Sequence, residues 1–242
     1  MNSMHNGPDQ SAPRWGLDGL RFGVGHTLAL LPGTAVFGAA FGTVAAQKGL
    51  TLAEAAAMSL FVFSGAAQMV AMEIWSNPIT IGTILTLAAS TLVVGLRMVL
   101  MGASLRPWLG TLPPAQIYPP LLLNTDSTWL IAVRYREGGG SDPSVLWGAG
   151  LSLWVIWQAS TIAGYAIGNL IANPERYGLD LILPIFFVAM LVPLWRGPRR
   201  AAPWAIAGAV ALIVQYLVPG YWYIVIGSLA GAFSGGFIDE RT

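Results

Sequence analysis

The chain of 242 residues is 55% hydrophobic and only 10% charged, and its mean hydropathy is +0.63. A water-soluble domain of this size needs charge on every exposed face. The composition therefore excludes a water-soluble domain and indicates a protein that is surrounded by the lipid bilayer. The net charge of +1 comes without a basic stripe, which argues against nucleic-acid binding. The lack of cysteine excludes disulfides, thiolate metal sites and cysteine nucleophiles.

Charge-free blocks run through most of the chain. No Asp, Glu, Lys or Arg occurs in 22–47, 55–72, 74–96, 107–125, 143–174 or 201–238. A helix needs about 20 apolar residues to cross a bilayer, and these runs are unbroken rather than alternating, which favours helices. The sequence therefore predicts an all-α fold, a polytopic membrane helix bundle of seven to eight segments with broken helices.

The predicted segments define one transmembrane domain over 21–238, with a polar N-terminal tail at 1–20 and a short polar C-terminus at 239–242. In chain order they are 22–46, 52–74, 78–101, 117–134, 145–172, 180–195, 201–218 and 220–238. No basic stretch leads directly into an apolar run at the start, so we expect no cleaved signal peptide.

The positions of Lys and Arg predict which ends of the segments face the cytoplasm. Eight crossings with the N-terminus inside would leave only Lys48, Arg106 and Arg176 outside. Seven crossings with the N-terminus outside give the same division, if 117–134 does not cross. The charge count cannot separate the two. We favour eight segments, because 117–134 is apolar apart from a polar cluster that must face protein or a wet cavity, as in a half-helix or re-entrant element.

Helix breakers mark the first and sixth segments. Pro32-Gly33 interrupts 22–46, and Pro184 interrupts 180–195. Proline frees a carbonyl and glycine permits unwinding, and the free backbone groups of a broken helix can hold a zwitterion. We therefore take Pro32 and Gly33 as candidate substrate-binding residues; the alternative is a purely structural kink.

An uncharged polar pair lies in the second segment. Ser64 and Gln68 are four residues apart, which would place them on one helix face, and Gly65, Ala66 and Ala67 leave space between them. Such a pair can line a substrate site or form a hydrogen bond between helices. Both remain open, and we take Ser64 and Gln68 as candidate substrate-binding residues.

The fourth segment carries the densest polar cluster, which contains Asn124 and Asp126. A lipid-facing helix would not carry this cluster, so Asn124 is a further candidate for substrate binding. Asp126 is a candidate for proton coupling together with Arg97, the other ionisable residue deep in a segment. The alternatives are a structural ion pair between the two, or an Arg97 side chain that extends to the interface.

Small residues recur four apart in three segments and predict close helix packing. The pairs are Gly38/Gly42, Gly164/Gly168 and the triple Gly227/Gly231/Gly235. The triple is also the best candidate for a face that docks a second subunit.

Several stretches resemble the AzlC/YgaZ family. GLTLAEAAAMSLFVFSGAAQMVAM, residues 49–72, is similar to the family's G-[FL]-[ST]-x2-E opening and G-A-[AS]-Q core. GLRMVLMGASLRP, LLLNTDSTWLIA and LDLILPIFFVAMLVP resemble later segments in the same order. The chain departs from the family pattern at Gly95, Met98 and Ser127, so a role for a second acid after Asp126 does not carry over.

The resemblance implies an exporter of branched-chain amino acids in the bacterial inner membrane, driven by the proton gradient. It also implies a small AzlD/YgaH-like membrane subunit as partner. We expect no enzymatic activity, no cofactor and no metal site, because no triad, P-loop or metal-ligand spacing occurs. The other classes are a structural or assembly membrane subunit without its own transport cycle, and an intramembrane enzyme.

Overall fold

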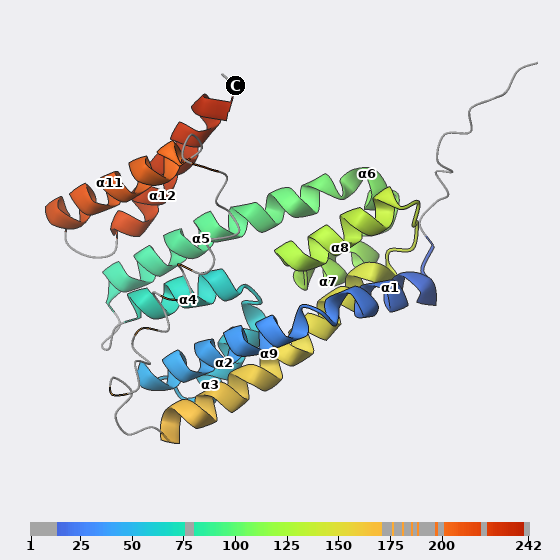
Figure 1. Ribbon diagram of the computed structural model, residues 1–242, viewed down its shortest axis with the longest axis horizontal. Coiled ribbons are helices and arrows are strands. Elements are labelled where there is room, and N and C mark those ends of the chain that lie inside the picture. Colours follow the sequence, from blue (N-terminus) through green and yellow to red (C-terminus); the bar gives the residue numbers. More distant parts are fainter. Residues whose placement is uncertain are drawn as a thin grey trace, which may run out of the picture.

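The computed structural model describes residues 14–75, 80–170, 201–218 and 222–239, and the single residues Arg176, Leu181, Ile185, Val188 and Gly197. Every regular element in these ranges is a helix, so the chain is an all-α membrane helix bundle, as predicted (Figure 1). α5 (Ile81–Ser104) and α9 (Ser144–Leu170) are each long and apolar enough to cross a membrane. The proposed break at Pro184 lies outside the described residues.

The first predicted segment is broken as expected. α1 (Leu17–Thr27) and α2 (Leu31–Gln47) meet at a bend of 68°. Pro32 lies in the first turn of α2, where its missing N–H costs no hydrogen bond. The break therefore falls at 28–30, directly before the Pro32-Gly33 pair.

The second predicted segment, 52–74, does not cross as one helix, which corrects the sequence prediction. It divides into α3 (Leu52–Phe61) and α4 (Gly65–Ile74). Ala55 near the start of α3 and Met72 near the end of α4 belong to one buried cluster, with Trp75 packed against it. Both ends of this α3–α4 hairpin therefore lie at the same end of the bundle, and its tip at 62–64 points inward.

The fourth predicted segment also folds back. After the short α6 (Arg106–Leu109), the chain forms α7 (Pro114–Leu122) and α8 (Asp126–Glu137). At the start of α7, Gln116 Oε1 accepts a hydrogen bond of 2.9 Å from Trp15 Nε1. At the end of α8, the Arg136 guanidinium lies 5.9 Å from the ring centroid of Trp108. The α7–α8 hairpin thus enters and leaves at the end of the bundle where α1 begins, so 117–134 is re-entrant rather than a crossing.

The two hairpins enter from opposite ends. In Figure 1 α5 and α9 run the length of the bundle, with α6 and the start of α1 at the right and the α2–α3 junction at the left. Arg106 therefore lies at the same end as Arg134 and Arg136, not on the opposite side as the charge count had placed it. Lys48, directly after α2, lies at the other end.

Interlocking small residues join α2 to α9, which make the most extensive contact of any two helices that the structure describes. A Cβ added at Gly42 or Gly164 would collide with the backbone carbonyl of Thr161 or Ala39 respectively. The close approach lets Thr43 Oγ1 donate to the Gly164 carbonyl at 3.0 Å. The predicted packing role of these glycines is confirmed.

The C-terminal helices form a second small-residue pair. α11 (Ala202–Leu217) packs on α12 (Trp222–Asp239), and α12 also contacts α5. A Cβ at Gly227 would lie 2.8 Å from that of Ala211, and one at Gly231 would lie 2.7 Å from that of Ala207. These glycines therefore serve packing within the chain.

A carboxylate fixes α1 against the start of α9. Asp142 accepts hydrogen bonds from the backbone N–H of Gly16 at 3.0 Å, Gly19 at 2.8 Å and Ser144 at 3.0 Å. Burial alone would raise the pKa of Asp142, but the hydrogen bonds from Ser144, Gly19 and Gly16 outweigh it and hold the pKa below its usual value. Asp142 therefore stays ionised near neutral pH and holds the N-terminus of α1 in place.

The re-entrant hairpins predict a labelling pattern, which the cysteine-free chain makes simple to read. Single cysteines at Ala115 and Glu137, on either side of the α7–α8 hairpin, should react with a membrane-impermeant maleimide from the same side of the membrane. Cysteines at Ala53 and Glu73 should both react from the other side. Labelling of the Ala115 and Glu137 positions from opposite sides would show that 117–134 crosses.

Candidate functional site

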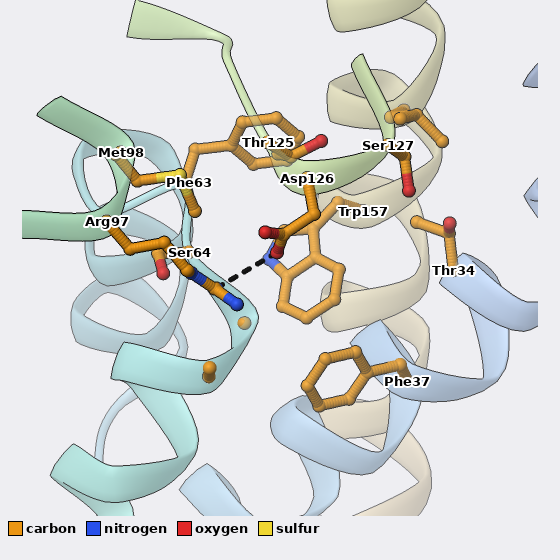
Figure 2. A pocket seen from close by; sticks show the side chains of 13 residues that line it. Thr34, Phe37, Phe63, Ser64, Arg97, Met98, Thr125, Asp126, Ser127 and Trp157 are labelled. Carbon is orange, nitrogen blue, oxygen red and sulfur yellow. Dashed lines mark ion pairs between the residues drawn. The ribbon is translucent and has the colours of Figure 1, made fainter. Parts of the chain in front are cut away.

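The tips of the two hairpins meet α2, α5 and α9 at a cavity of about 150 Å³ in the middle of the bundle (Figure 2). The first turns of α2 contribute Thr34 and Phe37, while α5 contributes Arg97 and Met98 and α9 contributes Leu153 and Trp157. The two hairpin tips supply the rest of the wall: Phe63, Ser64, Gly65, Ala66, Thr125, Asp126 and Ser127. Tips that enter from opposite ends therefore share one cavity.

Both hairpins present a helix N-terminus to this cavity. α4 begins at Gly65 and α8 begins at Asp126. The first N–H groups of a helix have no partner within it and carry partial positive charge. The Ser64 side chain makes no capping hydrogen bond, so the start of α4 presents its N–H groups without a side-chain cap.

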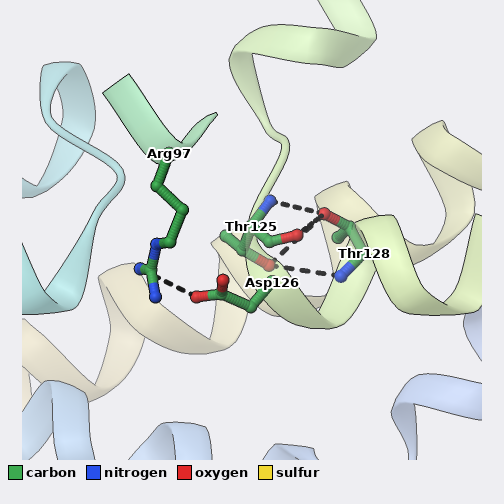
Figure 3. Close-up of polar contacts among 4 residues, drawn as sticks. All are labelled: Arg97, Thr125, Asp126 and Thr128. Atoms are coloured by element: carbon green, nitrogen blue, oxygen red, sulfur yellow. Dashed lines mark hydrogen bonds and ion pairs between the residues drawn. The ribbon is translucent and has the colours of Figure 1, made fainter. Parts of the chain in front are cut away.

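The start of α8 is organised differently, because its own side chains cap it. Thr125 and Thr128 form a reciprocal capping box, in which Thr128 N donates to Thr125 Oγ1 at 3.3 Å (Figure 3). Thr128 Oγ1 is also 3.1 Å from Asn124 Oδ1, and Asn124 is buried. Asn124 thus stabilises the tip and does not line the cavity, while its Nδ2 has no hydrogen-bond partner among the residues that the structure describes.

An ion pair lies at the cavity wall. Arg97 Nη2 on α5 is 2.9 Å from Asp126 Oδ2 at the start of α8 (Figures 2 and 3). The two side chains remain 43% and 48% exposed, respectively, so both charges can be reached by a ligand. A carboxylate in the first turn of a helix is also favoured by the helix dipole. The structure therefore brings together the two residues that the sequence selected for proton coupling.

Aromatic rings form the apolar side of the cavity. Phe37 meets Trp157 edge to face, with ring centroids 4.9 Å apart. Gly65 makes room for both rings, because a Cβ there would lie 2.5 Å from Phe37 Cε1 and 2.8 Å from Trp157 Cη2. The cavity thus combines a charged side with an aromatic side.

Gln68 lies behind this wall, not on it. It is fully buried in α4, and its Nε2 donates to Ser59 Oγ at 3.2 Å. The expectation that Ser64 and Gln68 share a face of one helix is corrected, because Ser64 has extended backbone at the helix start. Sequence reasoning missed Ser59, since a lone serine in an apolar run gives no signal of its partners.

The remaining candidates from the sequence lie beside the cavity in the chain but not on its wall. Pro32 and Gly33 are exposed at the start of α2, directly before Thr34, and neither lines the cavity. Of the seven candidate residues, Ser64, Arg97 and Asp126 form its wall. No group of three or more His, Cys, Asp or Glu that could hold a metal occurs among the described residues.

Comparison with known proteins places these features in a family context. Residues 29–171, which include every part of the cavity wall, match the family model described as AzlC protein. The chain is also 23% identical to an uncharacterized membrane protein of Helicobacter pylori, over 84% of this chain and 87% of that one. No solved structure matches the chain.

A double-mutant cycle tests whether the ion pair is accessible or a fixed strut. We expect Arg97→Met and Asp126→Asn to show a coupling energy of about 0.2–1 kcal/mol in thermal unfolding of the purified protein, as half-exposed pairs do. If the pair were instead a buried strut, removal of one partner would lower the free energy of unfolding by about 3 kcal/mol or more. Coupling of that size would contradict a ligand-accessible pair.

Proposed function

Because the chain belongs to the AzlC family, we propose that it is a secondary transporter that exports branched-chain amino acids across the bacterial inner membrane. The observation that carries the proposal is the accessible Arg97–Asp126 pair beside an aromatic wall in a central cavity. A zwitterion with an apolar side chain has the complementary chemistry: one negative group, one positive group and an aliphatic part.

The charges of the site suggest how the substrate is oriented. Its carboxylate would lie between the Arg97 guanidinium and the free N–H groups at the start of α4, since both are positive. Its ammonium group would lie on the Asp126 carboxylate. Arg97 and Asp126 pair with each other in the structure, and a bound zwitterion would replace that one pair with two.

The cavity size supports a short aliphatic side chain. A cavity of about 150 Å³ holds a molecule the size of benzene, and the amino and carboxylate groups of the substrate would take up part of the similar volume found here, about 150 Å³. Phe37, Trp157 and Leu153 would surround the three or four side-chain carbons of valine, leucine or isoleucine. A larger aromatic side chain would need one of these walls to move.

Asp126 offers a simple route to proton coupling. One carboxylate can hold a substrate ammonium group or a proton, but not both. If Asp126 releases the amino acid outside and returns with a proton, outward movement of substrate is exchanged for inward movement of protons. The two hairpins, entering from opposite ends, provide a separate closure on each side of the site.

The charge distribution supports an orientation in the membrane. Arg14, Arg21, Arg106, Arg134 and Arg136 lie on α6, or in or near α1 and the last turn of α8, all at one end of the bundle. By the positive-inside rule we assign that end to the cytoplasm. We further propose a small AzlD/YgaH-like membrane subunit as partner, as in the family the chain resembles.

Amino-acid efflux tests the proposal. Cells that express the protein with its partner and are preloaded with a leucine-containing dipeptide should export leucine, and an uncoupler should abolish the export. Asp126→Asn should lower leucine efflux at least about tenfold, because a hydrogen bond to a charged group is worth about 1.5–3 kcal/mol.

Glu73→Gln makes the same chemical change on the exposed outer part of α4 and serves as the matched control, for which we expect wild-type efflux. Asp126→Glu should keep part of the activity, because it retains the charge. Wild-type efflux by Asp126→Asn that still responds to the uncoupler would exclude Asp126 as the coupling site.

A further inference from the structure

A buried polar cluster lies directly behind the aromatic wall of the cavity. Ser59 Oγ, on α3, is 3.2 Å from Trp157 Nε1, 3.2 Å from Gln68 Nε2 and 3.0 Å from Thr161 Oγ1. Ser59, Gln68 and Thr161 are fully buried and Trp157 is only 4% exposed. One hydroxyl therefore joins α3, α4 and α9.

The chemistry of the partners fixes the direction of each hydrogen bond. The indole N–H of Trp157 and the amide N–H of Gln68 can only donate, so Ser59 accepts both with its two lone pairs. Its single hydrogen is then left for Thr161 Oγ1. The Ser59 hydroxyl is thus fully used, and no water is needed to satisfy it.

Trp157 connects this cluster to the site. One edge of the indole donates to Ser59, while Cη2 on the far side of the ring points at Gly65 in the cavity wall. The ring plane is also set by the edge-to-face contact with Phe37. The hydrogen bond to Ser59 ties the N–H edge of the indole to α3, on the side of the ring away from the cavity.

We propose that Ser59 is a positioning residue that sets the size selectivity of the site by holding the indole of Trp157. Ser59 does not line the cavity and acts only through that ring. The inference rests on the proposed function for the identity of the substrate, but not for the position of the ring. Without Ser59 Oγ the indole N–H has no partner in its buried place, so the ring gains freedom to turn away and the cavity deepens.

Selectivity is the first readout. In Ser59→Ala and in Trp157→Phe, the ratio of leucine efflux to phenylalanine efflux should fall about tenfold, equivalent to about 1.4 kcal/mol. The double variant should show no further fall, because both changes remove the same hydrogen bond. Thr161→Val is the matched control: it removes a partner of Ser59 that does not touch the cavity, and the ratio should stay within about twofold of wild type.

A second readout needs no substrate. A single cysteine at Thr34, on the cavity wall, is the only thiol in the chain. Its alkylation by a small uncharged maleimide should become about tenfold faster in Ser59→Ala and Trp157→Phe, and remain unchanged in Thr161→Val.

The two readouts separate the two claims. Faster alkylation in a protein that exports no amino acid would support the positioning role and contradict the proposed function. Leucine export with unchanged alkylation and an unchanged efflux ratio in both variants would overturn the positioning role. Equal losses of leucine and phenylalanine efflux at wild-type alkylation rates would also overturn it, because they would make Ser59 a folding residue.

Discussion

In hydrocarbon, every backbone N–H and C=O needs a partner within the protein, so a helix can break at membrane depth only where protein or a wet cavity covers the break. This constraint organises the bundle. The breaks before α4 and before α8 meet beside α9 at one cavity, and the first turns of α2 complete its wall. The glycine contacts between α2 and α9 and the space left at Gly65 allow the helices to come close enough to cover them.

The same arrangement brings charged groups together at a depth where contact with lipid would carry a high free-energy cost. Helix starts that enter from opposite ends bring their partial positive charge to one point, and Asp126 sits at one of them within 2.9 Å of Arg97. The ion pair gives each charge a partner within the protein. Under the proposed function, a net-neutral zwitterion would pair with both residues without adding net charge to the membrane interior.

Much of the fold and of the site could be predicted from the sequence, and the predictions that failed did so for physical reasons. Pro32 predicted the first break, and the polar run around Asp126 indicated a segment that lipid could not surround. The break at Ser64 carries no proline, and the apolar pattern of 52–74 reads the same for one helix as for two half-helices. Gln68 was expected on the wall because its side chain is polar. Its actual partner is Ser59, nine positions back, which only the fold of the hairpin brings within reach.

The central claim is that the cavity recognises both charges of an amino acid at once. Equilibrium binding of radiolabelled leucine to the purified protein, with its partner subunit, tests this directly. Leucine should be displaced by valine and isoleucine but not by the amine or the carboxylic acid that share its aliphatic chain, because each leaves Arg97 or Asp126 without a partner. Displacement by either singly charged analogue as strong as that by valine would contradict the account.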